Sequence, residues 1–295
     1  MELSDYLRDE ILEEANLGYI SPDERDRRLN AFDSTFENGV SSKPGVEQPG
    51  EKSASSPGKY EDSDDSLFAS EIYIKSNSTD VRAYLAKPKL PGALPGVLVI
   101  HENKGLTPHI EDVTRRLARE GFVAIAPDLL SRRGGSNAFS EPSEATAALS
   151  TIRGYELDED LLAVISYLVE NDSVQSDKLG AIGFCFGGGM VWRLATKEPR
   201  LKAAVPFYGV NPAIKYVPQI QASVLAIYGE LDERINAGID EIVNAMDANH
   251  KIFEKIIYPG AQHGFHNDTN TDRYHPQAAQ QAWQKTLDWL HRWLA

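Results

Sequence analysis

Short apolar runs alternate with helical patterns along most of this chain, and this alternation limits its fold more than any other feature. The apolar runs lie at residues 97–101, 122–127, 179–184, 203–208 and 224–228, with a last one marked by Ile252, Ile256 and Ile257. Helical spacing of apolar residues is clearest over residues 107–120, 156–170 and 276–294. Strands that are apolar throughout are typical of a parallel sheet covered by helices on both faces. The sequence therefore predicts an α/β fold with a mostly parallel central sheet, in which ligands bind beyond the carboxyl ends of the strands.

The predicted α/β domain follows a segment of different composition. Strand patterns at 72–74 and 81–85 flank a polar turn and predict an opening β-hairpin. Residues 1–36 carry two short helical patterns, and residues 37–66 are rich in Ser, Pro, Gly and acidic side chains. We therefore expect a short helical leader, a flexible linker, and one α/β domain over residues 67–295.

The charge balance excludes several classes of function. The 295 residues hold 44 acidic and 30 basic side chains, which gives a formal net charge of −14 at pH 7. Most of the imbalance lies in residues 1–66, which hold 17 acidic and 7 basic side chains. Nucleic-acid binding needs clustered Lys and Arg, and no apolar run approaches the roughly 18 to 20 residues that cross a bilayer. We therefore expect neither a nucleic acid nor a membrane as a partner.

Cys185 is the only cysteine of the chain, so it cannot form an intramolecular disulfide, and we expect a cytoplasmic location. It lies in Gly-Phe-Cys-Phe-Gly-Gly at 183–188, between an apolar strand and a predicted helix that begins near Gly188. This is the strand–turn–helix context of a nucleophile elbow, with Cys in place of Ser. The glycines avoid side-chain collisions at the sharp turn, and the helix N-terminus favours a thiolate. We therefore interpret Cys185 as a nucleophile rather than an inert buried thiol.

Two further residues supply what a nucleophile needs, a base and a group that orients the base. Asp232 follows the apolar run at 224–228, and His263 follows the last predicted strand. The chain order Cys185, Asp232, His263 is the nucleophile–acid–base order of α/β-hydrolases. Glu230 and Glu233 remain alternatives for the acid.

The loop after the strand at 97–101 contributes a fourth group, Glu102, whose carboxylate would face the thiol across the cavity. The same loop supplies the second oxyanion N–H in folds of this type, here from Asn103. The first comes from Phe186, directly after the nucleophile. An exposed loop acid is the alternative interpretation of Glu102.

At these positions the sequence resembles the dienelactone hydrolase family, the carboxymethylenebutenolidases. The matching motifs span about residues 68–295 and lie at 100–105, 126–129, 183–188, 207–209, 229–232 and 263–268. The resemblance implies an α/β-hydrolase fold and a cysteine hydrolase that cleaves small activated esters or lactones without a cofactor or metal. It also implies that Cys185 is the nucleophile, His263 the base and Asp232 its orienting acid. Glu102 would hold the resting thiol and take part in its ionisation once substrate enters.

The resemblance further implies arginines that bind a substrate carboxylate. Arg132 or Arg133 would take the place of one of them. His266 and Asn267 stand where the family has the other, a few residues after His263. We therefore expect Arg132, Arg133 and His266 to contact the substrate.

Two other interpretations remain open. The acidic leader has no evident catalytic use, so one alternative is a non-catalytic or regulatory binding module in which the leader mediates an interaction or self-association. The second is a metal site formed by His263 and His266 with Asp268 or His275, because the His-x-x-His spacing occurs in metal sites. His263 is better used as a base, so we expect no metal.

Overall fold

The computed structural model describes residue 26, residues 64–77 and residues 79–295. The predicted leader apart from residue 26, most of the predicted linker and the interactions expected of the leader lie outside the described residues. Asp64, at the end of the predicted linker, is already tied to the folded part, because its carboxylate accepts a hydrogen bond from Arg119 at 2.7 Å. The described part contains no helix that is long and apolar enough to cross a membrane.

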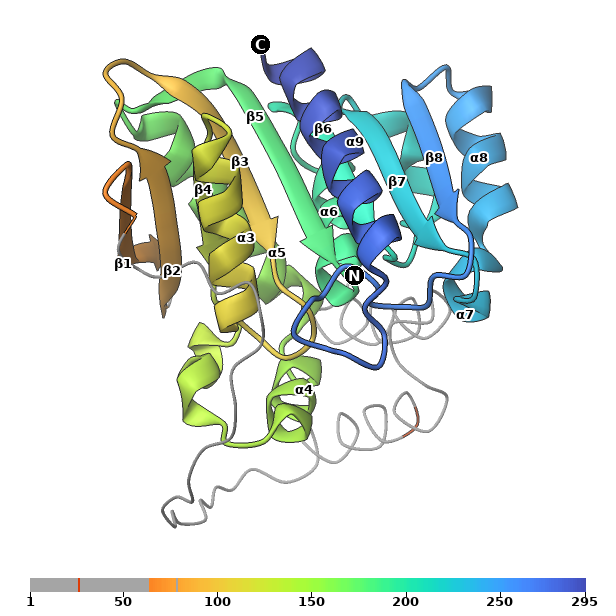
Figure 1. The fold of residues 1–295 in the computed structure, drawn as a ribbon, viewed down its shortest axis with the longest axis horizontal. Coiled ribbons are helices and arrows are strands. Elements are labelled where there is room, and N and C mark those ends of the chain that lie inside the picture. The colour runs from red at the N-terminus through yellow and green to blue at the C-terminus, as the bar shows by residue number, and fades with distance from the viewer. Residues whose placement is uncertain (1–25, 27–63, 78) are drawn as a thin grey trace, which may run out of the picture. The chain divides into compact units, whose positions relative to one another are not determined.

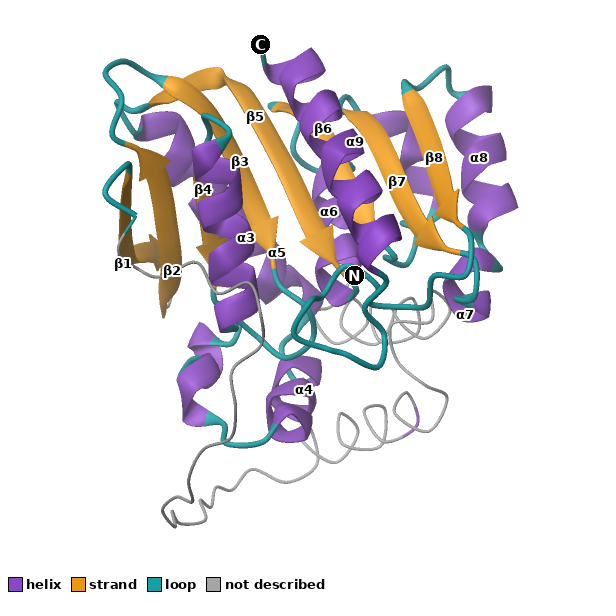
Figure 2. Ribbon diagram, in the orientation of Figure 1, coloured by secondary structure: helices purple, strands orange, loops and turns teal. Residues whose placement is uncertain are grey.

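An eight-stranded sheet forms the centre of the described residues (Figure 2). Its strands are β1 (Leu67–Ser76), β2 (Thr79–Pro88), β3 (Leu94–Ile100), β4 (Val123–Pro127), β5 (Val174–Phe184), β6 (Leu201–Phe207), β7 (Ser223–Gly229) and β8 (Phe253–Tyr258). They lie in the order β1-β2-β4-β3-β5-β6-β7-β8. β2 pairs antiparallel with both β1 and β4, and all other neighbours are parallel. The predicted hairpin and the mostly parallel sheet are confirmed.

Helices cover both faces of this sheet, as the sequence predicts (Figure 1). The α-helices are α3 (Pro108–Arg119), α4 (Pro142–Ser150), α5 (Gly154–Glu170), α6 (Phe186–Ala195), α7 (Glu233–Asn236), α8 (Ile239–Ala248) and α9 (Pro276–Leu294). The described residues also form the short 3-10 helices η1 (Ser131–Arg133), η2 (Ser136–Ala138) and η3 (Ile214–Gln219). α3 and α9 pack on one face and share one apolar core, whereas α5, α6 and α8 pack on the other face around a second core.

The sequence pattern explains why these segments are strands. The structure departs from the predictions at two helices, α6 and α4. Every residue of β4 and β7 is buried, as a strand between two helical layers requires. α6 begins at Phe186, directly after Cys185, and not near Gly188 as predicted. α4 was not predicted because it buries only Ala145 and Leu149, which is too few for a helical stripe.

The chain leaves the central strands β3 and β5 in opposite directions. From β3 it crosses through α3 to β4, and from β5 it passes through α6 to β6, on the other side of the pair. Such a reversal opens a crevice beyond the carboxyl ends of the two strands. Ile100 of β3 pairs with Gly183 of β5, so the residues that follow enter this crevice at the same level.

Candidate active site

Cys185 lies on a sharp turn between β5 and α6. Its backbone has φ 56° and ψ −114°, a combination that L residues rarely adopt. Glycines permit the turn, because a Cβ on Gly183 would collide with the Gly187 carbonyl, and one on Gly187 with the Ile100 carbonyl. The Cys185 N–H donates to the Phe207 carbonyl at 3.1 Å, which ties the turn to β6. The strained turn thus presents a partly exposed thiol at the carboxyl end of β5.

His263 and Asp232 stand in line with this thiol. His263 Nε2 lies 2.9 Å from Cys185 Sγ, and His263 Nδ1 donates to Asp232 Oδ2 at 2.5 Å. Burial by itself lowers the pKa of His263, but the hydrogen bonds to Asp232 and Cys185 outweigh it and raise this pKa to about 9. The structure therefore brings the three predicted residues together, with the charged imidazolium favoured beside the sulfur.

Asp232, not a neighbouring glutamate, is the carboxylate that contacts His263. Its side chain is only 6% exposed and precedes the first turn of α7. Glu230 instead accepts a hydrogen bond from the Gly260 N–H at 2.8 Å, and Glu233 is exposed at the start of α7. The two glutamates are therefore not placed as the acid.

Glu102 lies in the loop after β3 and is buried, with 9% of its surface exposed. It follows the paired residue Ile100 by two positions, as Cys185 follows Gly183, so the two residues leave neighbouring strands at one level. Glu102 Oε2 accepts a hydrogen bond from Asn267 Nδ2 at 2.7 Å. Glu102 is therefore not an exposed loop acid, and Asn267 is its partner, a contact that the sequence did not predict.

Tyr208 belongs to the same site, although no prediction from the sequence includes it. It follows β6 with φ 38° and is fully buried. Burial raises the pKa of its phenol well above the usual value, with further contributions from the charges of Glu102, Cys185 and Asp232. Its ring lies 5.1 Å from the His263 ring. The sequence signals are its position at the end of an apolar run and its place in the family motif at 207–209.

The two predicted oxyanion N–H groups belong to segments that pack against each other. Phe186 is the first residue of α6, and Asn103 lies in the loop after β3. The close approach of Gly187 to carbonyls at the end of β3 brings these segments into backbone contact. The Asn103 carbonyl accepts a hydrogen bond from Thr146 Oγ1 at 3.2 Å, which fastens this loop to α4. Their part in binding an oxyanion stays a prediction.

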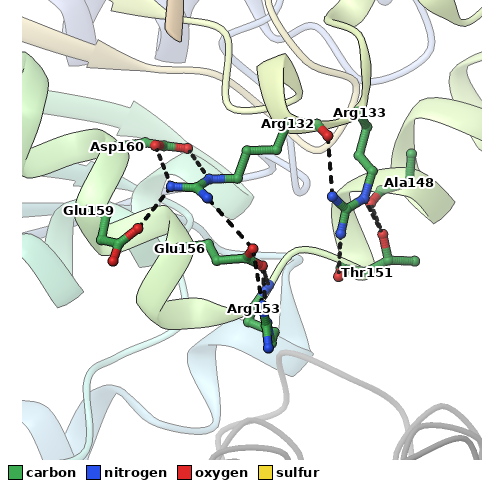
Figure 3. A network of polar contacts seen from close by, with 8 residues as sticks. All are labelled: Arg132, Arg133, Ala148, Thr151, Arg153, Glu156, Glu159 and Asp160. Carbon is green, nitrogen blue, oxygen red and sulfur yellow. Dashed lines mark hydrogen bonds and ion pairs between the residues drawn. The ribbon is translucent and has the colours of Figure 1, made fainter. Parts of the chain in front are cut away.

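The two arginines expected to bind substrate have other partners (Figure 3). Arg132 donates to both oxygens of the fully buried Asp160 at 2.9 Å and to Glu159 at 3.0 Å. Arg133 donates to the hydroxyl and carbonyl oxygens of Thr151, at the end of α4. These guanidinium groups fasten η1 to α4 and α5, and contact with a substrate would require the bonds to break.

His266 lies in the core and not at the thiol. It is 2% exposed, its ring stacks on Phe184 with 5.0 Å between centroids, and Trp283 lies 5.8 Å away. Burial lowers the pKa of His266 well below its usual value, so the ring is neutral. This position does not support the predicted contact with substrate.

The residues of the alternative metal site also have other partners. Asp268 accepts hydrogen bonds from His109 at 3.1 Å and from Arg116 at 2.6 Å. His275 Nδ1 accepts from the Ala278 N–H and caps α9. Among the residues that the structure describes, no three or more His, Cys, Asp or Glu side chains are grouped to hold a metal ion. The two histidines of the His-x-x-His spacing thus have separate surroundings, with His263 at the thiol and His266 in the aromatic core.

Known proteins are similar to this chain in sequence. Residues 81–294 match the model of the dienelactone hydrolase family. A protein of Escherichia coli O157:H7 with the name "Putative carboxymethylenebutenolidase" is 34% identical over 243 residues, which cover 78% of this chain and 89% of that protein. A protein of the same name from Saccharolobus solfataricus is 32% identical over 257 residues, which cover 75% of this chain and 98% of that one.

Known structures share the fold. A crystal structure titled "Putative Dienelactone Hydrolase", from Klebsiella pneumoniae, is 33% identical with a TM-score of 0.71 and covers 77% of this chain and 99% of its own. The dienelactone hydrolase structure from Anabaena variabilis has a TM-score of 0.63 at 22% identity, over 78% of this chain and 100% of its own. The expected α/β-hydrolase fold is thus confirmed, and the chain belongs to the dienelactone hydrolase family.

Proposed function

We propose that this protein is a cysteine-dependent hydrolase of small activated esters or lactones, with Cys185 as nucleophile, His263 as base and Asp232 as the orienting acid. Family membership makes the chain a hydrolase of the ester and lactone class. The observation that carries the proposal is the line of contacts from Cys185 Sγ to His263 Nε2, at 2.9 Å, and from His263 Nδ1 to Asp232 Oδ2, at 2.5 Å. A base exchanges a proton with a nucleophile at such distances.

The first half of the reaction transfers the acyl group to sulfur. His263 Nε2 holds the proton of the Cys185 thiol while the thiolate attacks the carbonyl carbon of the substrate. The carbonyl oxygen becomes an oxyanion, which the N–H groups of Phe186 and Asn103 stabilise. Collapse of this intermediate breaks the bond to the leaving oxygen, which takes the proton from His263. The product is a thioacyl-enzyme and a free alcohol, or an opened lactone.

The second half uses water and the same base. His263 Nε2 takes one proton from water as the oxygen attacks the thioester carbon. The carbon–sulfur bond then breaks, the carboxylic acid leaves, and Cys185 is a thiolate beside the protonated His263 again. Asp232 stabilises this imidazolium throughout, because its carboxylate accepts the Nδ1 proton. All of these steps use side chains and backbone of this chain.

Glu102 contributes a carboxylate at the level of the thiol. In the structure the sulfur contacts His263, and Glu102 contacts Asn267, which supports His263 as the partner of the resting thiol in place of the expected Glu102. We propose that Glu102 repels the thiolate until substrate binds and so limits its reaction with other electrophiles. A cytoplasmic location, where a free thiol stays reduced, fits this chemistry.

The test compares Cys185→Ala and Cys185→Ser with the unaltered protein on p-nitrophenyl acetate. We expect kcat/KM to fall by about a thousandfold or more in Cys185→Ala, because the acyl acceptor is gone. Thermal unfolding curves of all three proteins separate loss of chemistry from loss of fold. An unchanged rate in a folded Cys185→Ala variant would contradict the proposal.

A further inference from the structure

The charged groups that gather around the thiol are mostly anionic. Glu102 and Cys185 leave paired strands at one level, and Asp232 is joined to the thiol through His263. Burial is the main cause of the raised pKa of the Tyr208 phenol, and the charges of Glu102, Cys185 and Asp232 each raise it further. Glu102 and Asp232 set two carboxylates against the one imidazolium of His263, whose pKa is raised to about 9, so these three side chains together carry a net negative charge.

The partner of Glu102 is neutral, and its orientation is fixed. Asn267 is 6% exposed, and its Oδ1 accepts hydrogen bonds from the N–H and the hydroxyl of Thr269, at 3.0 and 2.6 Å. The backbone N–H of Thr269 can only donate, so the side-chain atom of Asn267 that it contacts is the amide oxygen. Asn267 Nδ2 therefore points at Glu102 and donates to it at 2.7 Å. An amide binds the carboxylate without cancelling its charge.

Two arginines of the described residues pair with carboxylates other than Glu102. Arg132 binds Asp160, and Arg116 lies 2.6 Å from both Asp112 and Asp268. The next basic residues along the chain from Glu102 and Asp232 are Lys104 and Arg234, and both side chains are exposed. In the described part of the chain, the buried carboxylate of Glu102 is thus held by a neutral donor.

We propose that Asn267 holds Glu102 as an uncompensated carboxylate beside Cys185, and that the site consequently selects neutral esters or lactones and rejects those that carry a carboxylate. This inference rests on the proposed hydrolase function and names its substrate class. A substrate carboxylate that approaches the thiol would meet the like charge of the buried Glu102 side chain, and repulsion beside a buried group is stronger than in water. Asn267 is a positioning residue in this account, because it acts through Glu102.

The test uses two substrates of equal length, the p-nitrophenyl monoester of adipic acid and the same compound with its free carboxylate as a methyl ester. Release of p-nitrophenol reports only the activated ester bond. We expect kcat/KM to be at least about tenfold higher for the neutral compound. Equal rates, or a faster anionic compound, would overturn this inference and leave the hydrolase function standing. If neither compound is cleaved, both this inference and the proposed hydrolase function are contradicted.

Variants identify the source of the selectivity. Glu102→Gln keeps the shape and an acceptor for Asn267 but removes the charge, so we expect the ratio of neutral to anionic kcat/KM to fall at least about threefold even if both rates drop. Asn267→Asp adds a carboxylate against Glu102, so the two groups share a proton and the pH profile of kcat/KM shifts upward. Lys104→Ala is the control, and its ratio should stay unchanged. An unchanged ratio in Glu102→Gln, or a changed one in Lys104→Ala, would overturn the inference.

Discussion

Glu102 and Cys185 each lie two residues beyond a paired position, Ile100 of β3 and Gly183 of β5, on neighbouring parallel strands. Adjacent strands are about 4.8 Å apart, so this register alone brings a carboxylate and a thiol to the same end of the sheet. The chain leaves the two strands in opposite directions, which is the arrangement at which α/β sheets bind ligands. Sheet register, and not a local sequence motif, therefore sets the relation between these two groups.

Asp232→Asn should lower kcat/KM for p-nitrophenyl acetate by roughly a hundredfold or more, because the amide can favour the wrong tautomer of His263 and cannot balance its charge. Glu230→Gln is the matched control, because Glu230 bonds the Gly260 N–H and not His263. Steady-state kinetics on the two variants check this. Equal losses in both, or a loss only in Glu230→Gln, would contradict the assignment of the acid.

Gly187→Ala should destabilise the fold by about 3 kcal/mol or prevent folding, because the new Cβ would overlap the carbonyls at the end of β3. Gly92→Ala is a useful comparison. Gly92 also has an unusual backbone, with φ 93°, but nothing lies within 4 Å of an added Cβ. Gly92→Ala should lower the free energy of unfolding by about 1 kcal/mol. Urea unfolding measures the free energy of unfolding of both variants. Similar decreases in the two would contradict the claim that close contact with the end of β3 excludes a side chain at position 187.

Arg132→Met should reduce the free energy of unfolding by about 3 kcal/mol, because it leaves the buried carboxylate of Asp160 without its cation. It should leave KM for neutral esters nearly unchanged. Arg133→Met removes bonds to Thr151 at an exposed position and should cost less than about 1 kcal/mol. A large rise of KM in Arg132→Met with unchanged stability would instead restore a substrate-binding role.

The contribution of His263 to stability should decrease as the pH rises. Its pKa is raised by folding from 6.5 to about 9, so the folded state binds the proton more tightly. The resulting stabilisation is complete below about pH 6.5 and is lost as the pH rises through about 9. The difference in unfolding free energy between the unaltered protein and His263→Gln should therefore shrink by on the order of 2 kcal/mol between about pH 6 and pH 10. A difference that grows with pH would contradict the ion-pair geometry.

The sheet could be predicted because buried parallel strands are apolar on both faces. Such strands appear in the sequence as continuous apolar runs. The line of Cys185, Asp232 and His263 could be predicted for a related reason. Each residue lies within about five positions of the end of its strand, and parallel strands have their carboxyl ends at one edge of the sheet. Local pattern and topology were sufficient for these parts.

The polar partners could not be predicted, because they depend on contacts between distant segments. Asn267 and Glu102 are 165 residues apart, and Arg132 meets Asp160 from another element 28 residues away. The same arginine pattern would fit a substrate clamp if Asp160 were apolar. His266 follows His263 closely in sequence, yet it turns into the aromatic core because the chain bends at Gly264, where φ is 81°.

The most direct test of the central claim is to trap the acyl-enzyme. The protein is mixed with p-nitrophenyl acetate, quenched in acid within the first turnovers and digested, and the peptides are sequenced by mass spectrometry. We expect a burst of p-nitrophenol equal to the concentration of active sites, with the acetyl group on the Cys185 peptide, and no acetylated peptide in Cys185→Ala. Full hydrolysis without an acetyl group on Cys185, or with it on another residue, would contradict the account.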